Sequence, residues 1–193
     1  MDETRAFFAA RAATWEEKFP DDGPVFAAAI EKLDLPPGGV ALDAGCGTGR
    51  ALPLLRAAVG PDGQVLGVDV TPEMIWSARD RGRRDHGRLL MADAERLPLR
   101  DGIVDGVLAA GLISHVRHPT ALLRELARVT TADARLGLFH PVGRAVLAAR
   151  HGRTLSPDDI RAEANLNPLL TAGGWNLVDF HDGDDHYLAV ATK

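Results

Sequence analysis

The segment VALDAGCGTGR, residues 40–50, constrains the fold more than any other part of the sequence. A short apolar run ends at the carboxylate of Asp43, and glycines follow at alternate positions: Gly45, Gly47 and Gly49. A tight turn from strand to helix needs backbone angles that glycine adopts at little cost, and it exposes backbone N–H groups to a ligand. The segment therefore predicts a buried strand, a ligand-binding turn and a helix.

The rest of the chain repeats this alternation of strand and helix. Apolar runs of strand length recur between segments with helical spacing or a proline at the first helical position. The predicted strands are residues 40–43, 64–70, 88–91, 103–110, 134–140, 176–181 and 186–192. The link between the last two is short enough for a hairpin, which makes the final strand antiparallel. The pattern predicts an α/β fold: a doubly wound, mostly parallel seven-stranded sheet with helices on both faces and a C-terminal antiparallel hairpin.

Two helices are predicted before the first strand, over residues 1–19 and about 24–33, and they form an N-terminal helical cap. A later helix is expected to start near Ser156, where the sequence resembles a capping box. The chain has 193 residues and no evident linker, so we expect a single domain over residues 1–193. Within it, residues 1–37 would be the cap and residues 38–193 a Rossmann-like core.

Composition excludes several classes of protein. Hydrophobic residues make up 46% and charged residues 25%, which is typical of a globular chain. The net charge of −5 argues against nucleic acid as the main partner, because phosphate binding needs clustered Lys and Arg. The arginine-rich run 79–88 is broken by two aspartates, and we interpret it as a solvated helix end rather than a phosphate-binding patch.

The single cysteine, Cys46, excludes an internal disulfide. No early apolar run resembles a signal peptide, and no stretch is long enough to span a bilayer. We therefore expect a cytoplasmic protein without a membrane partner, as a monomer or homodimer.

Asp69 indicates which ligand the glycine turn binds. It ends the second predicted strand 20 residues after Gly49 (69 − 49 = 20), the offset at which an acidic residue meets ribose hydroxyls. A dinucleotide site would read Gly-x-Gly-x-x-Gly, whereas this turn reads Gly-x-Gly-x-Gly. A carboxylate at Asp43 is also unfavourable beside a pyrophosphate and suits a ligand with an ammonium group. A nicotinamide oxidoreductase is disfavoured for these reasons.

The stretch LDAGCGTG resembles the first motif of class I S-adenosylmethionine-dependent methyltransferases. The segments GVDVTPEMIWSA and MADAERLPLRDGIVDGVL and the closing hairpin follow in the same order as in that family. The resemblance implies a methyltransferase with S-adenosylmethionine as cofactor and S-adenosylhomocysteine as product. It implies a small-molecule acceptor with an O, N or C atom that receives the methyl group. The alternative is a non-catalytic regulatory or scaffold protein that binds the same cofactor.

The resemblance also implies roles for the matching residues. The implied cofactor-binding residues are Arg11, Trp15, Asp43, Gly45, Cys46, Gly47, Gly49, Asp69, Val70, Met74, Asp93, Ala94, Ala110 and Gly111. Among them, Asp69 would hold the ribose diol, Met74 would pack on the adenine, and Asp93 would accept a hydrogen bond from the adenine amino group. Core packing is the alternative for Met74, and capping of the next turn is the alternative for Asp93. In the first helix, Arg11 would pair with the methionine carboxylate and Trp15 would wall the methyl site, the alternative being simple packing on the sheet.

His115 and His140 are the candidate catalytic bases. His115 follows the fourth predicted strand and His140 ends the fifth, so both are expected at the carboxyl edge of the sheet. An imidazole has a suitable pKa for a general base, which is needed only if the acceptor is protonated at neutral pH. The alternative is that each imidazole hydrogen-bonds a loop carbonyl. His118 lies three residues after His115, but no metal site is expected there.

Overall fold

A seven-stranded sheet forms the centre of the computed structural model, which describes residues 2–18 and 22–193. The strands are β1 (Val40–Ala44), β2 (Gln64–Asp69), β3 (Arg88–Met91), β4 (Val104–Ala110), β5 (Thr130–His140), β6 (Asn176–Asp182) and β7 (Tyr187–Thr192). Their order is β3-β2-β1-β4-β5-β7-β6. The first five strands pair in parallel, and β7 lies antiparallel between β5 and β6. The predicted fold class is confirmed.

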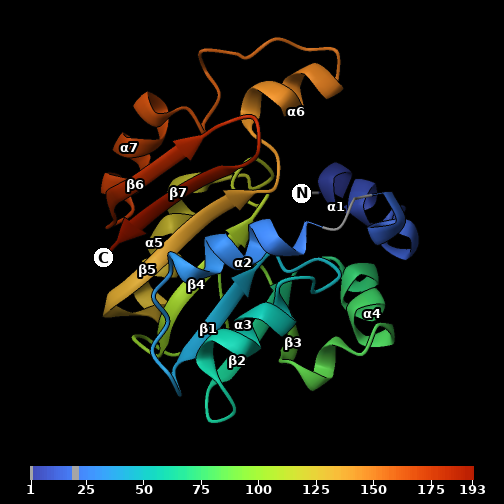
Figure 1. Cartoon of the computed structure of the whole chain (residues 1–193), viewed down its shortest axis with the longest axis vertical. Helices are drawn as coiled ribbons and strands as arrows, with labels where there is room; N and C mark the ends of the chain where they lie inside the picture. The colour runs from blue at the N-terminus through green and yellow to red at the C-terminus, as the bar shows by residue number, and fades with distance from the viewer. Residues whose placement is uncertain (1, 19–21) are drawn as a thin grey trace.

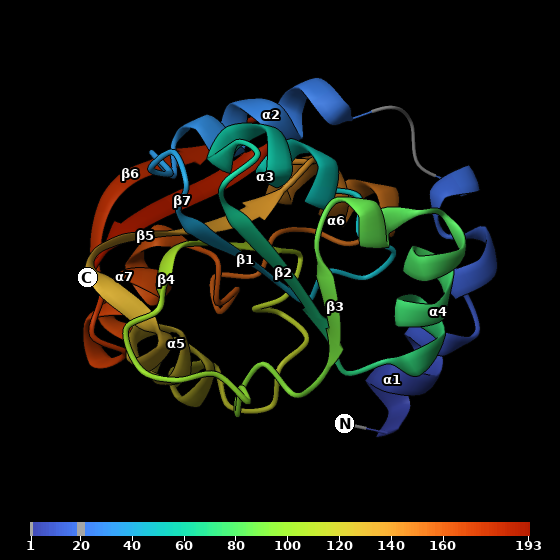
Figure 2. The ribbon, with the colours of Figure 1, turned by 90° about the horizontal axis from the view of Figure 1, so that it is seen from below.

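Helices cover both faces of the sheet. They are α1 (Asp2–Ala9), α2 (Gly23–Glu31), α3 (Leu52–Val59), α4 (Pro72–Asp80), α5 (Pro119–Val129), α6 (Arg144–Arg150) and α7 (Glu163–Ala172), with 3₁₀ turns η1 (Ala12–Thr14), η2 (Glu16–Lys18) and η3 (Arg83–Asp85). Figure 2 shows α2 and α3 on one side of the sheet and α5 and α7 on the other. None of the described helices is long and apolar enough to cross a membrane.

Packing on α5 fixes the loop that leads into it from β4. Leu122, Leu123 and Leu126 are fully buried, at spacings that place them on one helix face. Full burial of one such side chain stabilises a fold by about 1.5–3 kcal/mol. The buried indole of Trp175 also donates a hydrogen bond to the Leu123 carbonyl at 2.9 Å. The β4–α5 loop, which carries His115, therefore leaves a rigid scaffold.

The N-terminal cap differs from the single helix predicted over residues 1–19, of which residues 1 and 19 lie outside the described part. Helix α1 ends at Ala9, and two 3₁₀ turns follow. The carbonyl oxygen of Ala12 accepts from the Ser77 hydroxyl at 3.1 Å, and that of Ala13 accepts from the Arg81 guanidinium at 3.0 Å. Docking on α4 thus satisfies carbonyls that a continuous helix would have bonded internally.

The region between β5 and β6 also departs from prediction. No helix begins at Ser156; residues 151–162 are irregular, and α7 starts at Glu163. The Ser156 hydroxyl accepts from the Asp158 N–H at 3.1 Å, and Asp159 Oδ1 accepts from the Arg161 N–H at 2.9 Å. Side chains close local turns here, as they would at a helix start, but no helix follows. Helix α6 was not predicted. Figure 1 shows α6 and α1 at the edge of the sheet where the parallel strands end.

Candidate functional site

The turn after β1 is held against β2. The N–H groups of Gly45 and Cys46 both donate to the Val68 carbonyl, at 2.8 and 2.9 Å. Gly45, Gly47 and Gly49 have φ angles of 72°, 53° and 78°, in the left-handed region that favours glycine. The sequence pattern therefore predicted the backbone of this turn correctly.

The three glycines differ in what surrounds them. A Cβ atom at Gly45 or at Gly49 would lie 2.9 Å from a leucine methyl carbon, so these two are needed for packing as well as for φ. A Cβ at Gly47 would have only the Met74 sulfur nearby, at 3.9 Å. Gly47 is thus the glycine of this turn that faces open space, where a ligand can approach.

Asp69 joins the end of β2 to this turn. Its Oδ2 accepts from the Gly47 N–H at 2.9 Å, and its Oδ1 accepts from the Thr71 N–H at 2.8 Å. Burial raises the pKa of Asp69, and these two backbone bonds partly offset that rise. Each carboxylate oxygen has a second lone pair, so the group retains acceptor capacity for two hydroxyl donors.

Asp43 is a buried carboxyl group that lacks a donor in the described part of the chain. Its exposed fraction is 2%, and no side-chain hydrogen bond to it forms among residues 2–18 and 22–193. Burial and the nearby charge of Asp69 raise its pKa to about 7. A buried charge is costly unless it is paired. The site therefore fits a ligand that brings a cation, such as an ammonium group, to this carboxylate.

The other predicted cofactor residues lie around the same edge of the sheet. Met74 is buried on α4, so core packing accounts for part of its environment. Asp93 Oδ1 accepts from the Glu95 N–H at 2.9 Å, which is the capping role weighed as its alternative, and Oδ2 forms no hydrogen bond within the described chain. Ala94 is buried next in sequence to Asp93. Val70 directly follows β2 and is partly buried.

Cys46 and the end of β4 complete this set. Burial raises the pKa of the Cys46 thiol, and the charges of Asp43 and Asp69 add to that effect. Ala110 ends β4, and Gly111 follows with a φ of 66°. A Cβ at Gly111 would lie 3.9 Å from the His140 ring, so the ends of β4 and β5 meet here.

His140 makes the contact to a loop carbonyl that was the alternative to catalysis. Its Nδ1 lies 2.8 Å from the Val142 oxygen and 3.1 Å from the Val142 nitrogen. The shorter contact favours an Nδ1–H donor, which leaves the Nε2 lone pair as an acceptor. Burial lowers the pKa of His140, the bond to Val142 partly offsets this, and the positive charge of Arg161 lowers it further. The carbonyl contact and a base role are therefore compatible.

His115 lies on the β4–α5 loop against the cap. Its ring meets the ring of Phe8 edge to face, with centroids 5.1 Å apart. The residue keeps an exposed surface, but its neighbours partly desolvate the imidazole, and this, together with the Arg161 charge, lowers its pKa. Phe8 also contacts Trp15 at 5.5 Å between centroids. Phe8 is a site residue that the sequence did not single out, although its helical spacing from Trp15 was the available signal.

Arg11 follows α1 and contacts Phe7 of that helix. Its Nη1 donates to the Phe7 carbonyl at 2.9 Å, and its guanidinium carbon lies 3.7 Å from the centroid of the Phe7 ring. Its pairing with a methionine carboxylate stays a prediction, and that role would require these contacts to be exchanged.

Glu16 is a second residue that the sequence did not reveal. Its carboxylate accepts from the Thr48 hydroxyl at 2.7 Å and pairs with Arg83 at 3.3 Å and Arg81 at 3.8 Å. Thr48 lies between two glycines of the turn after β1, so the cap is bonded directly to that turn. The arginine-rich run therefore binds the cap through two of its members, which is more than the solvated helix end that we expected.

One group of possible metal ligands occurs among the described residues, at the turn between β6 and β7. Atoms of His181, Asp185 and His186 lie within 4.8 Å of one another. Both imidazoles contact the Asp185 carboxylate, at 2.9 and 2.7 Å. The predicted site residues include none of these three. His118 pairs with Glu95 at 2.9 Å and, within the described chain, forms no such group with His115.

Comparison with known proteins places these features in a family. The family model described as a methyltransferase domain matches residues 42–138, from β1 into β5. The malonyl-acyl-carrier-protein O-methyltransferase of Laribacter hongkongensis is 37% identical over 151 residues, 72% of this chain and 50% of that protein. The ubiquinone/menaquinone biosynthesis C-methyltransferase of Burkholderia mallei is 34% identical over 110 residues, 55% of this chain and 45% of that protein. The chain thus spans about half the length of these curated relatives.

A solved structure shows the same fold over nearly the whole chain. The S-adenosylmethionine-dependent methyltransferase of Aquifex aeolicus superposes with a TM-score of 0.73 at 22% identity and covers 97% of each chain. The fold is Rossmann-like, and the glycine turn, Asp43 and Asp69 lie together at the carboxyl edge of β1 and β2. The chain belongs to the class I S-adenosylmethionine-dependent methyltransferase family, as the sequence motifs predicted.

Proposed function

We propose that the chain transfers the methyl group of S-adenosylmethionine to an O, N or C atom of a small-molecule acceptor and releases S-adenosylhomocysteine. The family supports the reaction type, and the names of two relatives, which specify a malonyl group and quinone biosynthesis, support an acceptor group of small size. We propose that residues 1–193 act as one domain with a cap and a core. The cytoplasmic location and the monomeric or homodimeric state stay predictions.

The burial of the Asp43 carboxyl group is the main observation that supports the proposal. A buried carboxyl group that finds no donor among the described residues is costly in the free protein, and the ammonium group of a bound amino acid moiety would compensate it. Asp69 would bind the ribose hydroxyls through its remaining lone pairs. Gly47 leaves room for the ligand's close approach, Met74 and Ala94 would contact the adenine, and Asp93 Oδ2 would accept from its amino group.

The cofactor supplies an electrophilic methyl group, so the reaction needs no nucleophile from the protein. The chain then has three tasks: to hold the acceptor in line with the methyl group, to exclude water, and to accept a proton where the acceptor carries one. Phe8 and Trp15 provide aromatic surface for the second task. For the third, His140 Nε2 and the His115 imidazole are the candidate bases. The pKa of each is lowered, so both are neutral at pH 7 and able to accept a proton.

Calorimetry with S-adenosylhomocysteine tests the cofactor site. The Asp69→Ala variant loses two hydrogen bonds from ribose hydroxyls to a charged acceptor, each worth roughly 1.5–3 kcal/mol, so binding should weaken at least tenfold. Asp62→Ala, in the exposed turn before β2, is the matched control and should bind like the unmodified protein. Equal affinity in folded Asp69→Ala protein would refute the assignment of Asp69.

A screen of small acceptors with isotope-labelled S-adenosylmethionine then separates catalysis from binding alone. Transfer of label to any acceptor class supports the enzyme. Tight cofactor binding with no transfer across oxygen, nitrogen and carbon acceptors would favour the regulatory or scaffold alternative.

A further inference from the structure

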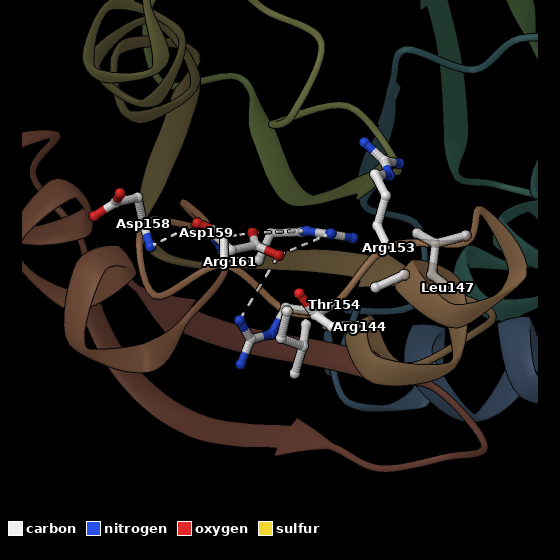
Figure 3. Close-up of a pocket in the computed structure, with 10 residues that line it drawn as sticks. Arg144, Leu147, Arg153, Thr154, Asp158, Asp159 and Arg161 are labelled. Carbon is white, nitrogen blue, oxygen red and sulfur yellow. Dashed lines mark hydrogen bonds and ion pairs between the residues drawn. The ribbon is translucent and has the colours of Figure 1, made fainter.

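A pocket with a volume of about 270 Å³ lies between α6 and the irregular segment 151–162 (Figure 3). Its wall combines three arginines with aliphatic carbons of Leu147 and Leu155 and the hydroxyl groups of Thr154 and Ser156. The volume is just below the range of roughly 300–1,000 Å³ that is typical of small-molecule sites. The pocket therefore suits a small organic group with both a polar and an apolar part.

Two of the three arginines are fixed by carboxylates. Arg161 donates from Nε and Nη2 to Asp159 at 3.2 and 3.0 Å. Arg144 pairs with Asp182 at 2.8 Å and with Asp159 at 3.7 Å. Asp159 binds Arg161 along one side of the guanidinium, so Nη1 of Arg161 remains without a hydrogen bond in the described chain. This arginine is held in place, yet it retains donors for a further acceptor.

The third arginine, Arg153, supplies excess positive charge. It is exposed, and its side chain makes no ion pair or hydrogen bond with the described residues. Figure 3 shows Arg153 on the side of the pocket toward which the Arg161 guanidinium extends, whereas the Asp158 carboxylate points outward at the opposite end. Asp159 is already paired, so the Arg153 end of the pocket is cationic.

This cationic end acts on both candidate bases. The charge of Arg161 lowers the pKa of His115 and of His140, and these residues come from different strand ends. The pocket is also close to them along the chain, because α6 begins only four residues after His140 (144 − 140 = 4). A group bound here would therefore adjoin the edge of the sheet where methyl transfer is proposed.

We propose that this pocket binds an anionic group of the methyl acceptor, a carboxylate or a similar small anion, through Arg153 and the unused donors of Arg161. Guanidinium groups match the geometry of a carboxylate, and charge-assisted hydrogen bonds are roughly twice as strong as neutral ones. Leu147 and Leu155 would contact the carbon skeleton beside the anion. This inference rests on the proposed function, since it names the chemical class of its acceptor.

Binding of matched acids and amides tests the inference without knowledge of the natural acceptor. Malonate, benzoate and hexanoate are each titrated into the protein saturated with S-adenosylhomocysteine, beside the corresponding neutral amide, and followed by NMR. We expect one or more of the carboxylates to bind at least tenfold more tightly than the amide of the same shape. Arg153→Gln should abolish that preference. Arg150→Gln removes one positive charge from α6 outside the pocket and should retain it.

The imidazole NMR signals of His140 give a second readout, which binding at a nonspecific surface site would not change. A bound anion offsets the Arg161 charge, so the pKa of His140 should rise when the preferred carboxylate is present. The inference is overturned if no carboxylate binds more tightly than its amide, or if Arg153→Gln keeps the preference. Failure of the unmodified protein to bind S-adenosylhomocysteine would instead contradict the proposed function, and that titration is done first.

Discussion

The Thr48 hydroxyl donates a 2.7 Å hydrogen bond to Glu16, across 32 residues of sequence. Thr48 is 1% exposed, and its neighbours Gly47 and Gly49 belong to the glycine turn after β1. The same carboxylate pairs with Arg83, which packs against Gly49. One side chain of the cap thus contacts both the turn and the helical region that supports it.

Removal of this carboxylate should loosen the cap. In Glu16→Ala, the cap loses one charge-assisted hydrogen bond, worth about 1.5–3 kcal/mol, together with its ion pairs. Amide hydrogen exchange in residues 2–18 should speed up roughly tenfold or more, while exchange in β1 and β4 stays slow. Glu17→Ala is the control, because Glu17 is the next acidic residue of the same 3₁₀ turn. The same exchange rates in both variants would show that Glu16 does not hold the cap.

Asp43 should make stability and cofactor binding depend on pH. Its folded pKa is raised to about 7. Because the unfolded pKa is about 3.9, the unfolded chain ionises first, so this group's contribution to stability falls as pH rises from about 4 to about 7. The ammonium group of bound S-adenosylhomocysteine favours the ionised form of Asp43. Affinity for this ligand should therefore rise between about pH 5.5 and 7.5, and binding should release protons.

Calorimetry in buffers of different ionisation enthalpy measures that proton release. Asp43→Asn should bind more weakly and should lose both pH dependences, because the titrating group is gone. If affinity and stability depended on pH as steeply in the variant as in the unmodified protein, another group would be responsible.

Gly47 should tolerate a side chain in the fold but not in the complex. The Gly47→Val variant has space for its Cβ, since the nearest atom is the Met74 sulfur at 3.9 Å, but the side chain would occupy the ligand's position. We expect loss of detectable S-adenosylhomocysteine binding. The φ of 53° adds strain of roughly 1–2 kcal/mol.

Gly102→Val controls for that strain. Gly102 has a φ of 63°, and a Cβ atom at this position would have a carbonyl oxygen at 4.0 Å as its nearest neighbour. The variant should destabilise the fold to a similar degree and still bind. Binding by Gly47→Val equal to that of Gly102→Val would place the ligand elsewhere.

The two histidines should affect turnover rather than cofactor affinity. If one of them accepts the acceptor's proton, its replacement by alanine should lower the rate by roughly 10²–10⁴-fold. The base must be deprotonated, and the pKa of each imidazole is lowered from its ordinary value of 6.5, so the rate should rise with pH below 6.5 and be level near neutrality. Steady-state rates with an acceptor from the screen measure this. Near-normal turnover in the His115→Ala/His140→Ala double variant would leave alignment alone as the mechanism.

The sequence predicted the parts of the site that depend on local pattern and topology. Asp43 and Asp69 end adjacent parallel strands, so the order of the strands is enough to bring them together. The left-handed angles at Gly45, Gly47 and Gly49 follow from residue type. The predicted strand boundaries agree with the observed ones to within a few residues, because the apolar runs that define the strands are contiguous.

The features that the sequence did not predict depend on contacts between distant segments. Nothing near Glu16 in the sequence indicates a partner at Thr48, and the break in the first helix arises because Ser77 and Arg81 bind its carbonyls. Two arginines of the pocket, Arg153 and Arg161, also lie in a segment without regular periodicity, where no pattern predicts which side chains meet. Local propensity at Ser156 predicted a helix, and the ion pairs of Asp159 with Arg144 and Arg161 accompany an irregular path instead.

The bridge from Glu16 to Thr48 has a consequence for the timing of the catalytic cycle. The cap contacts the glycine turn through Glu16 and the β4–α5 loop through Phe8, so it borders the candidate site from two sides. If exchange of product for fresh cofactor requires the cap to move, the opening of these two contacts sets the residence time of the product. Release, rather than methyl transfer, would in that case limit the number of turnovers per second, as it does in many enzymes with a mobile cap. A variant with a weakened cap would then bind its cofactor less tightly and still complete more cycles when cofactor is abundant.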